Sequence, residues 1–191
     1  MREILIIAGG AISVLGVLPY LRDVIRGKTK PRVVSWLTWT VLTAIATGAA
    51  LSDKAYASGI LTLAGTLATG SVVLAGLKYG DKKFERFDIF CLTGALVGLV
   101  LWLTFGSPEI AIIATVTIDF IGAMPTLRHS WQKPHEETEQ AFIISSFAAF
   151  LSLLAVEHIS ITNLAFPLYL TLMNATIASV VVTRKRVEVG E

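Results

Sequence analysis

Charged residues are scarce in this chain of 191 residues: Asp, Glu, Lys and Arg make up 16% of it, whereas ordinary soluble domains carry about 25%. Five stretches contain no charge at all, namely 33–52, 55–77, 89–108, 140–156 and 159–183. A helix needs about 20 predominantly apolar residues to cross a bilayer. The shortage of charge therefore excludes an ordinary water-soluble domain and predicts an all-α integral membrane protein.

Residues that commonly build catalytic and metal sites are also few. The one cysteine, Cys91, excludes a disulfide framework and a cysteine-based metal site. The three histidines lie near predicted membrane interfaces on two sides, which predicts no shared metal site. The sequence shows neither a Ser/His/Asp or Cys/His grouping nor a phosphate-binding glycine loop. We expect a protein without enzymatic activity and without a cofactor.

One segment of the chain occurs twice. Residues 3–22 read EILIIAGGAISVLGVLPYLR, residues 109–128 read EIAIIATVTIDFIGAMPTLR, and the two agree at 10 of 20 positions. An offset of 106 residues maps Pro19 onto Pro125, whereas Asp119 replaces Ser13. The agreement predicts an internal duplication, and the replacement predicts that the two copies enclose an asymmetric pocket.

Seven membrane spans follow from the apolar segments. We place them at 4–22, 33–52, 55–77, 87–106, 109–130, 140–157 and 160–182. Alternate connections between the spans hold 14 of the 16 Lys and Arg residues, which leaves Arg2 and Lys54 on the other side. Basic loops stay in the cytoplasm, so we expect the N-terminus outside and the C-terminus inside. The basic residues are then topology signals and contacts with the lipid bilayer, not a nucleic-acid surface, and we expect a prokaryotic cell membrane because no organelle address is apparent.

The repeat and the topology together predict an architecture. Both copies start outside and end in the cytoplasm, so two units of three helices can be parallel only if an odd helix joins them. We therefore predict a first three-helix repeat at 1–80, a linker helix at 81–107, and a second three-helix repeat with a cytoplasmic tail at 108–191. Parallel repeats of this kind are a recurring plan of membrane transporters.

The run GVLPYLRDVIRGKTKPRVVSWLTW, residues 16–39, resembles the PQ-loop motif of the SWEET, semiSWEET and cystinosin-like superfamily of seven-helix transporters. The shared features are a proline late in the first helix of each repeat, a short basic stretch, and a Ser-aromatic opening of the next helix. Tyr20 and Thr126 stand where that family has the glutamine of its motif. The resemblance implies the three-one-three fold over the whole chain, alternating access, and sugar as the default solute.

The matching prolines are candidate hinges. A proline inside a helix removes one backbone hydrogen bond and bends the helix. Pro19 and Pro125 occupy equivalent places, so both halves can bend at the same depth. The resemblance implies hinging at these prolines, and the alternative is a static kink that only shapes the bundle.

Asp119 is the candidate for solute binding and proton coupling. It lies midway along the fifth predicted span, where inserting an aspartate costs roughly 2.5–3.5 kcal/mol. Such a carboxylate can bind a proton or accept hydrogen bonds from hydroxyls and amines. The structural alternative is a protonated residue bonded to a neighbouring helix.

Further candidates for the solute pocket are polar or aromatic. Asn174 lies at a matching depth of the last span, where SWEET-like pockets have an asparagine; the alternative is a hydrogen bond between helices. The others stand at helical spacing, with packing between helices as the alternative for each: Trp39, Thr43, Thr47, Thr66, Thr69 and Thr171. Trp36 and Trp39 lie towards the cytoplasmic side, where such rings anchor helices at the membrane interface.

The expected function is a facilitator or proton-coupled carrier that moves a small polar solute by alternating access. Sugar is the default from the resemblance, and Asp119 favours an amino acid or amine as the rival. The alternatives are a non-transporting receptor of the same fold and a carrier for a vitamin precursor. The sequence is compatible with a homo-oligomer.

Overall fold

Helices make up the architecture of this computed structural model, which describes residues 2–52, 56–80, 85–104, 108–156 and 159–190. The described residues form seven α-helices and one short 3-10 helix, and they contain no strand. The elements are α1 (Arg2–Ile25), α2 (Val33–Ser52), α3 (Tyr56–Tyr79), α4 (Arg86–Thr104), α5 (Pro108–Gln132), η1 (Pro134–Glu136), α6 (Glu139–Leu154) and α7 (Ile161–Val189). The prediction of an all-α chain with seven helices is confirmed.

The helix ends follow local signals. α2 has the bounds of the predicted span, whereas α7 continues seven residues beyond the predicted end at 182. It does so as a charged surface helix in which Arg184 and Glu188 pair one turn apart at 3.6 Å, and Gly190 ends it with φ 85°. Predicted span residues 55, 105–106 and 157 lie outside the described residues.

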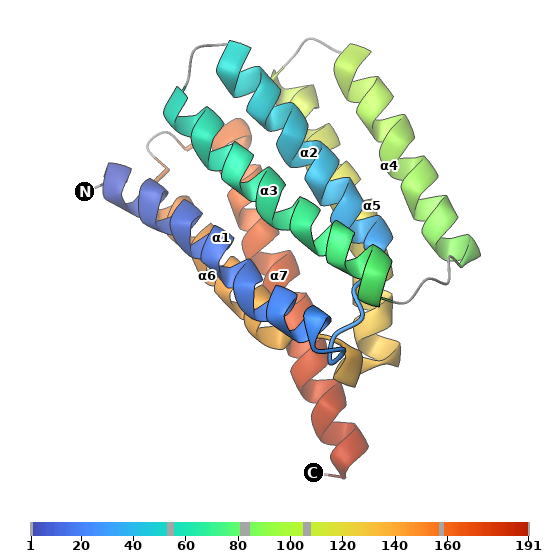
Figure 1. The fold of residues 1–191 in the computed structure, drawn as a ribbon. Coiled ribbons are helices and arrows are strands. Elements are labelled where there is room, and N and C mark those ends of the chain that lie inside the picture. Colours follow the sequence, from blue (N-terminus) through green and yellow to red (C-terminus); the bar gives the residue numbers. More distant parts are fainter. Residues whose placement is uncertain (1, 53–55, 81–84, 105–107, 157–158, 191) are drawn as a thin grey trace.

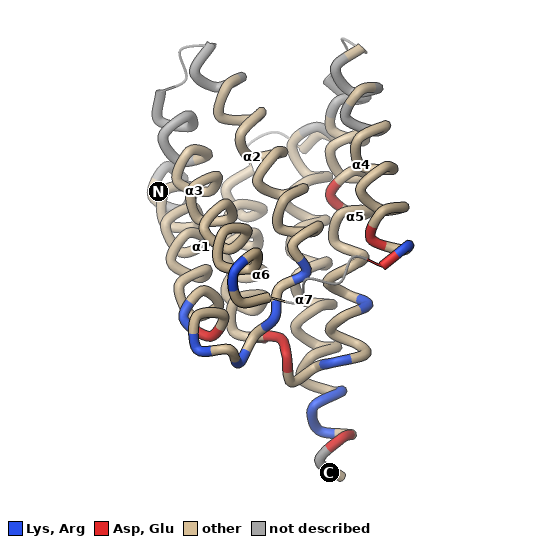
Figure 2. The backbone as a smooth tube through the Cα atoms, turned by 45° about the vertical axis from the view of Figure 1, so that its right-hand side comes forward, with Lys and Arg blue, Asp and Glu red and all other residues tan. Residues whose placement is uncertain are grey.

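Successive helices run in alternate directions, so that the C-terminal ends of α1, α3, α5 and α7 lie towards one end of the molecule (Figure 1). We call this the basic end, because the Lys and Arg residues of the described chain gather towards it (Figure 2). Lys82 and Lys83, which the sequence assigns to the same side, lie outside the described residues.

The helices contact one another in matching pairs. α1 packs on α3 and α6, and α5 packs correspondingly on α7 and α2. α2 packs on α3, and α6 packs on α7. The two tightest glycine contacts between different helices also match. A Cβ on Gly16 of α1 would meet Ile144 Cγ2 of α6 at 2.7 Å, and a Cβ on Gly122 of α5 would meet Thr38 Cγ2 of α2 at 2.6 Å.

The buried core holds an aromatic cluster. Tyr20 of α1 lies between Trp36 of α2, at 4.7 Å between ring centroids, and Phe142 of α6, at 5.9 Å. The indole N–H of Trp36 donates to the Tyr20 hydroxyl at 3.3 Å. The expectation that Trp36 anchors the helix at a membrane interface is wrong, because its ring packs into this core and is 4% exposed.

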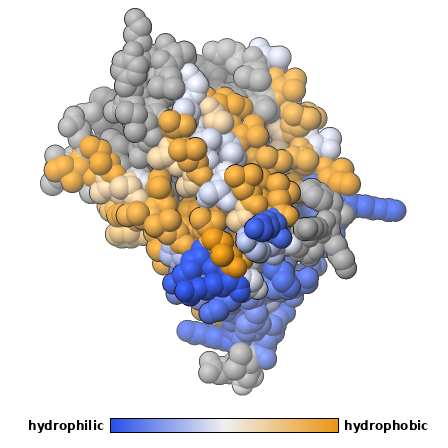
Figure 3. Space-filling model, viewed as in Figure 1, coloured by the Kyte–Doolittle hydropathy of each residue, from blue (hydrophilic) through white to orange (hydrophobic). Residues whose placement is uncertain are grey.

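The outer surface between the two ends is largely apolar. Orange hydrophobic side chains cover the helices in Figure 3, and the hydrophilic surface lies mostly towards the basic end. Leu74 of α3 and Phe90 of α4 are 72% and 74% exposed. Among the described residues, the segments Ile7–Ile25 and Asn163–Glu188 are long and apolar enough to cross a membrane, and Val33–Gly48 and Glu139–Leu154 are apolar but shorter.

Candidate functional site

The candidate site is centred on Asp119 of α5, whose side chain is buried where three helices meet. The Tyr169 hydroxyl of α7 donates to Asp119 Oδ2 at 2.7 Å. Trp39 of α2 is the second side chain that hydrogen-bonds this carboxyl group. Asp119 as a whole residue is 5% exposed. The structure therefore brings two of the predicted site residues, Asp119 and Trp39, together.

Close packing of α5 on α2 explains why Trp39 reaches Asp119. Gly122 follows Asp119 by one turn, and its missing side chain lets the Thr38 side chain approach the α5 backbone. Trp39, the next residue of α2, is thereby carried to the carboxyl group. On α7, the ring of Phe166 stacks on Tyr169 at 6.3 Å between centroids, which supports the phenol in its position beside Asp119.

The arrangement suits a cationic or polyhydroxylated ligand. A carboxylate only accepts hydrogen bonds, and it has about four lone-pair sites on its two oxygens. Tyr169 and Trp39 supply one donor each, so acceptor sites remain for an amine or a sugar hydroxyl. A carboxylate buried in an apolar bundle is costly unless donors compensate it, and Tyr169 and Trp39 supply such donors to Asp119.

The predicted threonines use their hydroxyls within their own helices. The five donate to a carbonyl of the preceding turn, a local bond that Thr commonly makes inside helices: Thr43 to Trp39 at 2.9 Å, Thr47 to Thr43 at 2.8 Å, Thr66 to Thr62 at 2.9 Å, Thr69 to Gly65 at 3.0 Å and Thr171 to Pro167 at 2.8 Å. The Thr47 and Thr66 hydroxyls also lie 3.4 Å apart, across α2 and α3. These bonds leave each hydroxyl oxygen able to accept, not to donate.

Asn174 also bonds within its helix. Its Nδ2 donates to the Leu170 carbonyl at 2.8 Å, so the amide oxygen keeps its acceptor capacity. Asn174 lies five residues beyond Tyr169 along α7. Its place in the solute pocket stays a prediction.

The two predicted hinges lie inside helices, Pro19 in α1 and Pro125 in α5. At the second of them, the backbone N–H of Thr126 donates to Ser35 Oγ of α2 at 3.2 Å, and both residues are buried. A side chain from α2 thus supports the α5 backbone directly after its proline.

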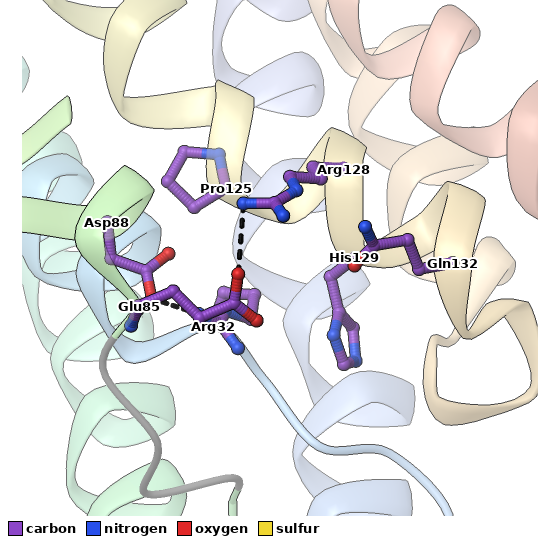
Figure 4. A pocket seen from close by; sticks show the side chains of 7 residues that line it. All are labelled: Arg32, Glu85, Asp88, Pro125, Arg128, His129 and Gln132. Carbon is purple, nitrogen blue, oxygen red and sulfur yellow. Dashed lines mark hydrogen bonds and ion pairs between the residues drawn. The ribbon is translucent and has the colours of Figure 1, made fainter. Parts of the chain in front are cut away.

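A second polar cluster lies at the basic end (Figure 4). Arg32, just before α2, pairs with the buried carboxylate of Asp88, which also accepts from the backbone N–H of Glu85 at 2.8 Å and so caps the start of α4. Glu85 pairs with Arg128 of α5 at 2.9 Å. The pocket between them has a volume of about 10 Å³, enough for one water molecule, so these ion pairs clamp α4 to its neighbours and leave no room for a solute.

Sequence reasoning missed two residues that the structure places in key contacts. Tyr169 is 50 residues from Asp119 along the chain. The one sequence feature that could have pointed to it is a tyrosine hydroxyl within the uncharged run 159–183. Glu137, directly after η1 in the connection from α5 to α6, is buried and accepts from the Tyr20 hydroxyl at 2.8 Å. Its signal is the acidic character of that loop.

No protein-family model, curated protein or solved structure matches this chain.

Proposed function

We propose that this protein is a membrane-embedded carrier that moves a small polar solute between two three-helix halves. The observation that carries the proposal is the buried carboxylate of Asp119, held by donors from α7 and from α2 of the other half. Polar and ionisable residues inside membrane-spanning bundles commonly mark solute or proton pathways, and a carrier needs such a polar site between its halves.

Membrane embedding is supported by the surface. All seven α-helices carry exposed Leu, Ile, Val or Phe side chains, apolar side chains cover much of the face shown in Figure 3, and most charged residues of the described chain lie towards the basic end (Figure 2). Exposed apolar patches of this extent are rare on soluble monomers. With basic loops retained in the cytoplasm, the basic end is the cytoplasmic end, in a prokaryotic cell membrane.

The parallel three-one-three arrangement is supported by contacts at an offset of 106 residues. Gly16 and Gly122 are equivalent under this offset, and so are their partners Ile144 and Thr38. Lys30 and Glu136, again equivalent, pair with each other at 2.5 Å. Equivalent residues of two halves can touch only near the axis that relates the halves, so this ion pair lies beside a pseudo-two-fold axis, with α4 as the linker.

The solute binds at Asp119, Trp39 and Tyr169, with Asn174 and the threonines Thr43, Thr47, Thr66, Thr69 and Thr171 as further lining residues. The carboxylate favours an amine or amino acid, and the resemblance to sugar carriers favours a sugar. Pro19 and Pro125 let both halves bend at one depth, which gives each side access to the site in turn.

A ligand screen tests the solute class. The purified protein in detergent is heated with sugars, amino acids, nucleosides and amines at two pH values. A ligand present at about five times its dissociation constant stabilises the folded state by roughly 1 kcal/mol. Stabilisation by one chemical class that is lost in Asp119→Asn supports the proposal. Equal stabilisation of the variant contradicts a role for this carboxylate.

Uptake into liposomes tests transport and coupling. We expect the solute found in the screen to accumulate, and its uptake to respond to a pH gradient. Asp119→Asn abolishes that response if Asp119 carries the coupled proton. If uptake by the wild type does not depend on pH, proton coupling is excluded and the protein is a facilitator. If the solute binds but is not taken up, a receptor of the same fold is favoured.

A further inference from the structure

The basic end is closed by contacts between the two halves. Thr29 and Thr138 share a hydrogen bond of 2.5 Å, Lys30 pairs with Glu136 at 2.5 Å, and Tyr20 donates to Glu137. We call these three pairs the latch. Because each pair joins the first half to the second, this end can open only when all three separate.

Glu137 is the unusual member of the latch. It is 2% exposed, and its Oε1 has no hydrogen-bond partner among the described residues. The equivalent position in the first half is Pro31, so the carboxyl group has no counterpart. A charged carboxylate in this setting is costly, and the closed latch therefore favours the protonated acid.

The neighbouring acid behaves differently. Burial acts to raise the pKa of Glu136, but the hydrogen bond from Lys30 and the charges of Lys133 and Lys30 outweigh it, so the pKa is lowered. At Glu137 burial dominates: it raises the pKa to about 8, against the opposing hydrogen bond from Tyr20 and the charge of Lys185. One latch acid thus stays ionised, and the other titrates near neutrality.

Glu137 also lines a cavity of about 180 Å³ at the basic end. Charged or titratable groups from every element around it face the same region: Tyr20 and Asp23 of α1, Lys28 and Arg32 between α1 and α2, His135 and Glu136 of η1, Glu139 of α6 and Lys185 of α7. Lys185 is engaged by the Glu137 carbonyl at 2.9 Å and by Glu139 Oε2 at 2.5 Å. The cavity gives protons a polar route to Glu137.

We propose that Glu137 is the proton-binding site that controls the basic end: the latch stays closed while Glu137 carries a proton and opens when the proton leaves. The inference rests on the proposed carrier function, because opening of this end matters only if a solute passes. It adds a titratable group distinct from Asp119.

The sign and size of the effect follow from linkage. In the open state Glu137 faces water and titrates near its ordinary value of about 4.3, whereas in the closed state its pKa is about 8. The closed state thus holds the proton more tightly. Between these two values the ratio of open to closed protein rises by up to about tenfold per pH unit, and above the closed-state value it levels off.

Cysteine labelling tests the latch without any transport. Ser35, which is buried between the halves, is replaced by cysteine in a Cys91→Ala background and labelled with an impermeant thiol reagent. Each rate is divided by that of a free thiol at the same pH, which removes the effect of thiolate formation. We expect the ratio to rise steeply up to pH 8 and then level off.

Two substitutions decide the assignment. Glu137→Gln keeps an acceptor for Tyr20 but cannot ionise, so the reporter stays protected at every pH. Glu139→Gln, the matched control two residues away, keeps the pH dependence. If Glu137→Gln does not fold, Tyr20→Phe tests the same contact. This variant keeps the ring but removes the hydroxyl that donates to Glu137, so we expect faster labelling at low pH.

The outcomes separate the two proposals. A flat labelling ratio in the wild type, or an unchanged rise in Glu137→Gln, overturns the latch assignment even if liposomes take up solute. The expected labelling pattern without uptake of any solute supports the latch and overturns the carrier.

Discussion

Replacing Gly122 by alanine tests the close approach of α5 to α2 that carries Trp39 to Asp119. The added Cβ would lie 2.6 Å from Thr38 Cγ2 and 3.0 Å from Thr38 Cβ. Ordinary carbon contacts are about 3.5–4.0 Å, so one helix must move by roughly 1 Å. Overpacking of this kind costs about 1–3 kcal/mol, and the better helix propensity of alanine returns up to about 1 kcal/mol. We expect a net loss of about 1–2 kcal/mol.

Thermal unfolding in detergent measures this loss. For a chain of this size, about 1–2 kcal/mol corresponds to a fall of roughly 2–8 °C in Tm. Gly48→Ala is the matched control, because nothing lies within 4 Å of its added Cβ, and we expect an unchanged or slightly higher Tm. Gly16→Ala should lose as much as Gly122→Ala, since its Cβ meets Ile144 Cγ2 at 2.7 Å.

Rescue variants remove the atom that clashes. Thr38→Ser deletes Cγ2 and should recover part of the loss in Gly122→Ala, and Ile144→Leu, which moves the branch away from Cβ, should do the same for Gly16→Ala. Tm values for Gly122→Ala and Gly48→Ala that coincide, or double variants no more stable than the single ones, would refute the packing described here.

Three further changes probe the polar contacts. Asp88→Asn breaks the buried pair with Arg32 and should cost about 3 kcal/mol of unfolding free energy, whereas Glu85→Gln, at a pair whose side chains are 46% and 42% exposed, should cost less than about 1 kcal/mol; equal losses would contradict the burial of the first pair. Tyr169→Phe removes the hydroxyl that donates to Asp119 and should weaken solute binding in a titration, with a stability change of about 1 kcal/mol; unchanged affinity would place the solute elsewhere. Asn174→Ala should weaken binding without unfolding the protein, because its amide nitrogen donates to the Leu170 carbonyl of its own helix; unchanged affinity would assign Asn174 to packing, and Thr176→Ala, at an exposed position of the same helix, is the control.

The helices could be predicted because their boundaries are set by charge. Arg32 and Asp53 enclose an uncharged run, and α2 fills the run between them. The end of α7 could not be found in this way, because apolarity stops near Thr183 while the helix continues. Its last turns are held by a pair one turn apart, Arg184 with Glu188, and by the turn at Gly190.

The inward faces of the helices could not be predicted. When a helix is apolar on all sides, its sequence carries little information on which face meets a neighbour. Asp119 stood out as a charge in an apolar run, but Tyr169 looked like any other uncharged position of α7. Only the packing of α5 on α7 brings the phenol to the carboxylate.

The threonines show a different difficulty. Hydroxyls at helical spacing in an apolar sequence predict a polar path, yet Thr43 and Thr66 donate to carbonyls of their own helices. This local bond is available to any helical threonine. Spacing alone therefore does not distinguish a threonine that offers its proton to a solute from one that has already used it.

A continuous line of contacts joins Asp119 to Glu137. Asp119 is hydrogen-bonded by Trp39, the Trp39 ring packs edge to face on Trp36 at 5.1 Å, and Trp36 donates to Tyr20, which donates to Glu137. The equivalent positions of the other half hold Ser13, Ser145, Phe142, Thr126 and Pro31, and these include no acid. In the proposed carrier, duplication would account for the matched contacts at Gly16 and Gly122, and divergence would account for the single line of contacts from Asp119 to Glu137. In the proposed carrier, a solute that moves Trp39 also disturbs the packing that holds the Tyr20 hydroxyl on Glu137, so occupancy of the site and closure of the basic end share the same aromatic residues.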